Sequence, residues 1–382
     1  MNMKAIKANL LYDGCGKEPV KDVFVTFDKK ISAVTSSKPD CEIIGEGVVT
    51  PAFIDAHCHI GMTRAGEPSS EEESNDEMQA ISPINDAMDS IYMDDPSFKD
   101  SVEWGVLYSH VMPGSGNIIG GKTVLIRNWA SDIEDALVKH IGMKAALGYN
   151  PRSMTKWKGE RPTTRMGAIG LLRRELYKAM KARELLKKKK KVVEEIDPIT
   201  EALMEIVDGQ LPLMVHVHKA DDVLILKRLI DEFGINAIAN HCADIHSESM
   251  WKKIKRAGLP VIYGPIDSFA HKVELKHGSW KNVGQLVKIA PKFGLMSDHP
   301  VMCQRNLFLQ LRYFVRFGMS RAEAIGIITR NNAEILGLKD LGTVENGKLA
   351  SLVLWNEDPF KLESYPLMAI GEGDILYCMK SD

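Results

Sequence analysis

Two pairs of histidines stand at the ends of apolar runs in this sequence, with one residue between the members of each pair. The first pair is His57 and His59, and the second is His216 and His218. Because side chains alternate between the two faces of an extended strand, both members of a pair leave the same face. Two imidazoles on one face form half of a metal site, although a lone pair would equally suit solvated or structural histidines.

Two further apolar runs end in residues that also bind metals. His241 follows one run and Asp298 follows another. Imidazole nitrogens together with a carboxylate suit zinc, and iron, nickel or manganese bind the same set. If the runs are parallel strands of one barrel, their carboxyl ends meet at one face. The sequence then predicts a single site whose members are His57, His59, His216, His241 and Asp298.

The elements that position these residues follow an alternating pattern of strands and helices. Eight short apolar runs lie at residues 48–54, 106–112, 123–126, 144–147, 213–217, 236–239, 260–263 and 293–296. Helical patterns lie between several of them, which favours a parallel sheet, and eight strands favour a closed (β/α)8 TIM barrel. Short alternating runs at both ends predict a small β-sandwich. We expect this composite β-sandwich domain at 1–49 plus 341–382, and the barrel at 50–340.

The overall composition is that of an ordinary soluble globular protein. The chain has 382 residues, of which 45% are hydrophobic and 26% charged, with a formal net charge of -2. This balance gives no reason to expect nucleic acid or a membrane as partner, and no apolar run approaches the roughly 20 residues of a membrane span. The 6 cysteines follow no repeated spacing. We therefore expect reduced thiols and a cytoplasmic location.

Two charged stretches interrupt the alternating pattern. The acidic segment 67–100 follows the first strand, so it is either a lid at the catalytic face or a solvated loop. The run of lysines at 187–191 ends a helical pattern and is typical of a solvated helix face.

Several motifs resemble those of the amidohydrolase superfamily. Pro51-Ala52-Phe53-Ile54-Asp55-Ala56-His57 with His59 resembles the first-strand motif, and Ser297-Asp298-His299-Pro300 resembles the last-strand motif. Residues 342–355 resemble the return of the chain into the accessory β-domain. The resemblance is closest to an imidazolonepropionase-like subgroup, whose features are echoed at 113–121, at 216–222, and in Gly264-Pro265 followed by Lys272-Val273-Glu274-Leu275.

The resemblance implies a role for each ligand. His57 and His59 would bind the more buried ion with Asp298, while His216 and His241 would complete that site or hold a second ion. Either His216 or His218 is the ligand, depending on the strand register, and we take His216.

The resemblance also implies a residue on the fourth strand, because in the two-metal members of that superfamily a carbamylated lysine or a glutamate there often bridges the ions. Tyr149 occupies the position of the glutamate, and a tyrosine with a free pKa of about 10 does not easily bridge two cations. Lys144, five positions earlier, is placed near the start of the strand, away from the site. We therefore expect one zinc ion rather than two.

These residues predict hydrolysis at a carbon bonded to nitrogen. A divalent ion lowers the pKa of bound water to about 7, and Asp298 would carry a proton to the leaving nitrogen, with His241 beside it. Candidate substrate contacts are His218, Tyr149, Arg165 and His299.

We expect a small cyclic amide or amidine, or an N-acyl compound, as substrate, and a homo-oligomer is compatible with such a barrel. One alternative is a prolidase-like metallodipeptidase, in which Arg165 or Arg127 would bind the peptide carboxylate. A catalytically impaired barrel that serves as a binding subunit is the other alternative.

Overall fold

The computed structural model describes residues 3–16, 18–152, 158–270 and 272–379. Its centre is an eight-stranded sheet with the strand order β12-β11-β10-β9-β8-β7-β6-β5. The bounds are β5 Phe53–Cys58, β6 Val106–Val111, β7 Ile119–Arg127, β8 Leu137–Ala146, β9 Leu213–Val217, β10 Ala237–His241, β11 Val261–Tyr263 and β12 Phe293–Leu295. The ends of β5 and β12 are joined where Asp298 N donates to His57 O at 3.0 Å and His59 N donates to His299 O at 2.9 Å. The sheet therefore curves round into the expected TIM-like barrel.

One strand runs against the prediction of an all-parallel barrel. β7 is antiparallel to both β6 and β8, whereas the other neighbouring pairs are parallel. The reason lies in the connections, because a parallel crossover needs about a dozen residues. Only residues 112–118 separate β6 from β7, so the chain must reverse. This loop therefore lies at the carboxyl end of β6, on the same face of the barrel as the predicted site.

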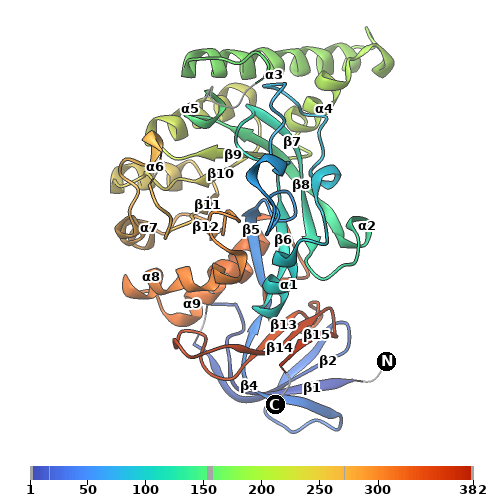
Figure 1. Cartoon of the computed structure of the whole chain (residues 1–382), viewed down its shortest axis with the longest axis vertical. Helices are drawn as coiled ribbons and strands as arrows, with labels where there is room; N and C mark the ends of the chain where they lie inside the picture. Colours follow the sequence, from blue (N-terminus) through green and yellow to red (C-terminus); the bar gives the residue numbers. More distant parts are fainter. Residues whose placement is uncertain (1–2, 17, 153–157, 271, 380–382) are drawn as a thin grey trace.

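Helices cover the outside of the barrel (Figure 1). They are α1 Pro96–Glu103, α2 Ile133–Ala136, α3 Arg165–Lys187, α4 Pro198–Val207, α5 Ala220–Phe233, α6 Glu248–Arg256, α7 Val283–Ile289, α8 Leu311–Arg316, α9 Arg321–Gly326 and α10 Asn332–Ile335. The strands β9 and β10 are buried along their whole length, as expected of strands covered on both faces. Within the described residues, none of the helices combines the length and hydropathy that a membrane span requires.

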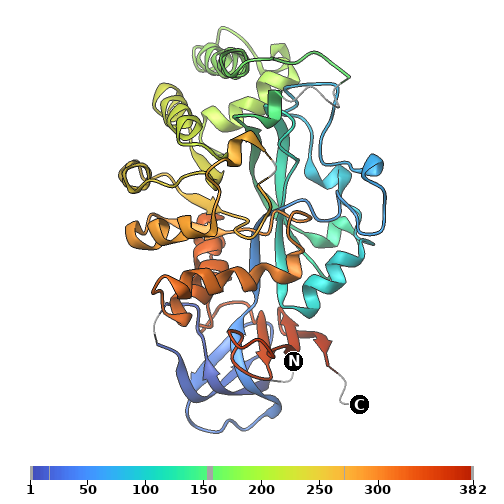
Figure 2. The same ribbon diagram turned by 60° about the vertical axis from the view of Figure 1, so that its left-hand side comes forward.

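A second sheet is built from both ends of the chain and lies at one end of the molecule (Figures 1 and 2). Its seven strands have the order β15-β14-β13-β4-β1-β2-β3. Their bounds are β1 Lys4–Leu11, β2 Val20–Phe27, β3 Ile31–Thr35, β4 Glu42–Pro51, β13 Leu352–Trp355, β14 Pro366–Gly371 and β15 Asp374–Cys378. The run expected as the first barrel strand is divided here, because β4 belongs to this sheet and β5 to the barrel. That both ends contribute is confirmed, while two-layered packing as a sandwich stays a prediction.

Candidate metal centre

The first histidine pair and the last strand meet across the barrel closure. His57 Nε2 and His59 Nε2 each lie 3.4 Å from Asp298 Oδ1, and His241 Nδ1 lies 4.0 Å from Asp298 Oδ2. The His57 side chain is fully buried, and that of Asp298 is 15% exposed. His57, His241 and Asp298 each offer a ligand atom, and these atoms lie within 4.8 Å of one another. The predicted convergence of β5, β10 and β12 is therefore present.

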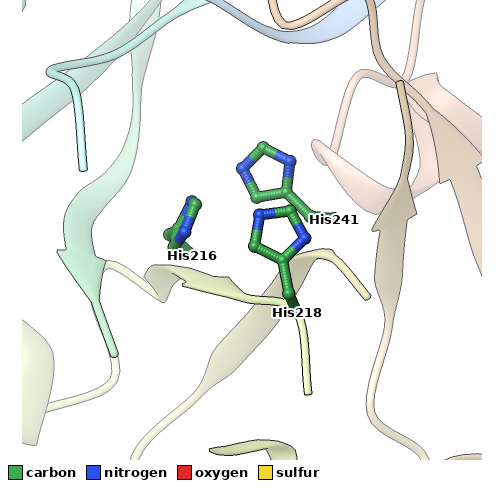
Figure 3. A group of neighbouring side chains, drawn as sticks. All are labelled: His216, His218 and His241. Atoms are coloured by element: carbon green, nitrogen blue, oxygen red, sulfur yellow. The ribbon is translucent and has the colours of Figure 1, made fainter. Parts of the chain in front are cut away.

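A second group of three histidines lies beside the first. His216 comes from β9, His218 directly follows that strand, His241 ends β10, and the three rings face one another (Figure 3). One ligand atom from each lies within 4.8 Å of the others, and all three side chains are buried. His216 and His218 are thus both brought to the site. His241 belongs to both groups, so the two groups lie side by side.

Backbone carbonyls fix the orientation of two of these rings. His59 Nδ1 lies 2.7 Å from Met112 O, and His241 Nδ1 lies 3.0 Å from Gly264 O. Because a carbonyl oxygen only accepts, both Nδ1 atoms carry the hydrogen. The lone pair of each ring is then on Nε2, where it is free for a cation.

Glu274 fixes the ring of His216, with the hydrogen on Nε2 instead of Nδ1. This carboxylate, on the short 3-10 helix η5 (Val273–Leu275), places Oε1 3.2 Å from His216 Nε2. Nε2 therefore carries the hydrogen, and the buried Nδ1 of His216 has no hydrogen-bond partner among the described residues. An unpartnered buried nitrogen is costly unless something binds it, and a metal ion would do so. Glu274 is a functional residue that the sequence reasoning missed.

The ionisation states in the site suit cation binding. Burial, followed by the charge of Lys144, lowers the pKa of His57 well below its ordinary value, and burial does the same for His216 and His241. These rings are neutral near pH 7. Burial alone would raise the pKa of Asp298, but its histidine neighbours and Lys144 hold it at about 2. The site therefore offers neutral nitrogens and one ionised carboxylate.

Lys144 lies inside the site, so its placement from the sequence was wrong. It stands near the end of β8, fully buried, with Nζ 3.2 Å from His57 Nε2. Burial lowers the pKa of Lys144 to about 7, with Asp298 opposing and Lys272 reinforcing this shift. Tyr149, which was aligned with the bridging position, is outside the cluster with a side chain that is 40% exposed. A charged residue inside an apolar run was the signal that could have identified Lys144.

The backbone is strained where two of the candidate ligands leave their strands. His241 has φ of 75° and Asp298 has φ of 53°, in a region that residues other than glycine rarely adopt. Such conformations cost of order 1–3 kcal/mol each and persist where the surrounding structure enforces them. The strain aims both side chains into the barrel mouth.

Asp55 ties the first strand to the last, behind the ligands. Its carboxylate accepts hydrogen bonds from Ser297 N at 3.1 Å, from Ser297 Oγ, and from Gln304 Nε2 at 2.9 Å. Burial raises the pKa of Asp55 to about 6, although these hydrogen bonds act to lower it. Asp55 therefore positions the segment that carries Asp298 against the strand that carries His57.

The remaining predicted site residues are engaged in other contacts. The Arg165 guanidinium lies 2.7 Å from Asp222 Oδ1, and Arg127 lies 2.7 Å from Glu372. His299 is buried, and its Nδ1 accepts from Gln304 N at 3.3 Å. Tyr149 donates its backbone N–H to Glu274 Oε2 at 2.9 Å. Substrate contact by Tyr149, His299 and Arg165 remains a prediction.

The acidic segment after β5 docks on the glycine-rich loop between β6 and β7. Asn75 Oδ1 accepts from Gly116 N at 2.7 Å, and Gly114 N donates to Ser74 O at 2.6 Å. A Cβ at Gly114 would lie 2.3 Å from Asn75 Nδ2, so no larger residue fits there without a shift. The glycines thus admit the Asn75 side chain, and the segment is attached at the rim of the barrel mouth.

Comparisons with known proteins agree with this geometry. Residues 176–373, just over half of the chain, match the model of the amidohydrolase family. The chain is similar to the crystal structure of an amidohydrolase from Thermotoga maritima MSB8, with 30% identity, a TM-score of 0.90, and coverage of 98% of this chain and 100% of the other. It therefore belongs to the amidohydrolase family, a family of hydrolases that generally use a divalent metal.

Two more distant similarities complete the comparison. Amidohydrolase tasK of Hapsidospora irregularis is 24% identical over 90% of this chain, and the chain spans only 38% of the length of that relative. A prolidase crystallised with N-methylphosphonate-L-proline has a TM-score of 0.63 at 15% identity, over 98% of this chain and 99% of that one. At this identity the likeness concerns the fold alone.

We predict that Glu274→Gln weakens metal binding. The amide keeps the shape of the side chain, but its oxygen is a weaker acceptor than the carboxylate and holds His216 Nε2–H less firmly. Weakening such a partner of a metal ligand costs about 10–100-fold in metal affinity. Zinc affinity is measured by competition with a chromophoric chelator. Glu248→Gln is the matched control, because Glu248 pairs with Lys252 of α6 and Lys288 of α7, away from the site. Equal affinity in Glu274→Gln and wild type would contradict the orienting role.

We predict that the metal-free protein loses stability as the pH falls below about 6.5. The ring of His110 is buried between Ala56 O and Thr123 Oγ1, and burial lowers its pKa to about 3. As the pH falls, the unfolded chain therefore takes up a proton before the folded protein does. The free energy of unfolding then falls by up to about 1.4 kcal/mol per pH unit for each such histidine.

His57, His216, His241 and His299 act in the same direction, whereas Asp55 and Asp222, whose pKa values are raised by burial, oppose them. The urea midpoint should fall between pH 7 and pH 5, and less steeply in His110→Asn. A urea midpoint at pH 5 that equals or exceeds the midpoint at pH 7 would contradict the prediction that the buried histidines dominate the pH dependence of stability.

Proposed function

We propose that this protein is a metal-dependent amidohydrolase that hydrolyses a carbon–nitrogen bond, other than an ordinary peptide bond, in a small molecule. The observation that carries the proposal is the convergence of candidate ligands from four strand ends, with the buried Lys144 of a fifth strand among them. We propose a cyclic amide or amidine, or an N-acyl compound, as substrate. A barrel without activity would have no physical need for this set, since burying polar groups costs free energy.

The donor set fits divalent ions, with zinc as our first choice. His57, His59 and Asp298 would hold one ion, and His216 and His241, with His218 beside them, would hold the other. A single ion was expected because Tyr149 cannot bridge, and with Lys144 in the site that reason no longer applies. We therefore propose two ions. A bound divalent ion supplies hydroxide from water near pH 7 and polarises the scissile group.

Asp298 is the residue that we propose to move the proton. Its pKa of about 2 keeps it ionised at neutral pH, so it can accept the proton of the attacking water. Its carboxylate lies beside His57, His59 and His241, at the point where the ligand groups meet. From there it can deliver the proton to the leaving nitrogen.

We propose that Lys144 carries a carbamate that bridges the ions. Its ammonium would repel cations held by His57, whose ring it contacts. The neutral amine instead attacks CO2, a nitrogen–carbon bond forms, one N–H proton leaves to solvent, and an anionic carboxylate results. Burial among histidines favours this product once cations are present, because opposite charges attract strongly in a low dielectric.

A prolidase-like dipeptidase is the second candidate function. It needs a cation for the substrate carboxylate, and Lys272 near the site favours it. We further propose that 50–340 forms the hydrolase domain, that 1–49 with 341–382 forms a composite β-sandwich domain, and that the protein is cytoplasmic.

Removal of the Lys144 amine should lower the metal content. We expect Lys144→Met to bind about one ion or none where wild type binds about two, because the bridge is lost. Metal analysis measures the content, and intact mass near neutral pH should show one added CO2 that acid removes. Lys139→Met is the matched control, since Lys139 lies on the same strand with Nζ on Gly337 O. Unchanged metal content in Lys144→Met would contradict the bridging role.

Hydrolysis itself is tested by loading the protein with zinc or manganese and screening hydantoins, imidazolones, N-acyl amino acids and Xaa-Pro dipeptides. We expect Asp298→Asn to lower turnover by about 10²–10⁴-fold, the usual contribution of a proton-transfer group. Asp267→Asn is the control, because Asp267 is an exposed carboxylate on the same face, paired with Arg312. No turnover of any compound by metal-loaded protein would refute the proposed function.

A further inference from the structure

A cation without a carboxylate partner lies near the metal centre. Lys272 stands in the loop after β11, two residues before Glu274, and forms no ion pair within 4.0 Å with any described residue. Its polar neighbour is Asn150, whose amide accepts from Lys272 Nζ at 3.0 Å in the orientation that satisfies all its contacts. The same amide donates to Glu274 Oε1 at 3.3 Å. The lysine is thus held in place by a neutral group that does not cancel its charge.

Three loops of the catalytic face build this position. Ser115 comes from the loop after β6, Asn150 from the loop after β8, and Lys272 from the loop after β11. Ser115 Oγ lies 2.6 Å from the Asn150 amide oxygen. Two residues connect Lys272 to the metal centre: Asn150 contacts both Lys272 and Glu274, and Glu274 contacts His216. Lys272 is also close enough that its charge lowers the pKa of both Lys144 and His216, after burial, which has the larger effect.

The two arginines first considered for an anion are already neutralised. Arg165 pairs with Asp222, and Arg127 pairs with Glu372 of the terminal sheet. The charge of Lys272 remains to be balanced from outside. A free cation beside a buried, metal-loaded site would attract an anionic ligand and orient it toward the reacting groups.

We propose that Lys272 binds the carboxylate of the substrate, so that the substrate is an N-acyl amino acid and not a neutral cyclic amide. This inference rests on the proposed hydrolase function and adds the substrate class. Asn150 holds the ammonium of Lys272 and Ser115 holds Asn150, so the ammonium is positioned for the substrate carboxylate. Lys272 is therefore a specificity-determining residue.

The test compares N-acetyl-L-methionine with N-acetyl-L-methionine amide, which differ only in the carboxylate. Hydrolysis and calorimetric binding of both are measured with zinc-loaded wild type and Lys272→Met. We expect the variant to lose about tenfold or more in kcat/KM and affinity for the acid, with the amide changed less than about twofold. Lys272→Arg should retain the preference, and Asn150→Asp should abolish it by pairing with Lys272.

Lys276→Met is the matched control, because Lys276 is exposed on the same segment and should leave both probes unchanged. If the metal itself bound the substrate carboxylate, both lysine variants would behave like wild type toward the two probes. Equal losses for acid and amide in Lys272→Met, or hydrolysis of hydantoins but neither probe, would overturn this inference while the hydrolase function stands. Absence of all hydrolysis together with equal binding of both probes would overturn both proposals.

Discussion

The site depends on a buried carboxylate that holds the two edge strands of the barrel together. Asp55 accepts from Ser297 and Gln304 across the closure between β5 and β12. Together with the backbone bonds from Asp298 N to His57 O and from His59 N to His299 O, these contacts fix the segment that carries Asp298 relative to the first histidine pair. The raised pKa of Asp55 reflects the cost of burying this charge, which the surrounding donors only partly offset. The cost of burying this carboxylate thus falls at the closure between β5 and β12, where the positions of the candidate ligands are set.

The sequence was most informative where chemistry sits at strand ends. His57, His59, His216, His241 and Asp298 were all identified because a polar residue at the end of an apolar run is unusual, and the barrel brings such ends together. The family resemblance and the TIM-like barrel were predicted on the same basis. The direction of β7 was missed because the argument counted strands and not the length of the connection between β6 and β7.

Residues that act from within strands or from loops were harder to predict. Lys144 was misplaced because β8 starts earlier than its apolar run, so the lysine lies near the end of the strand and not near its start. Glu274 belongs to a loop whose path no periodicity reveals, and only the folded chain shows that it contacts His216. This division has a physical basis: strands fix the reacting groups, while loops orient them and select the substrate.

The terminal sheet has a consequence for how the molecule is made. β4 continues into β5 with only Ala52 between them, and β4 pairs with β13, so that Trp355 donates to Thr50 over a separation of 305 residues. The strand that carries the first histidine pair is thus anchored by a partner synthesised long after it. Contacts so distant in sequence form late, because the intervening chain must be closed into a loop first. Early in biosynthesis the nascent chain therefore has no finished site, and metal uptake has to follow the emergence of its last strands from the ribosome.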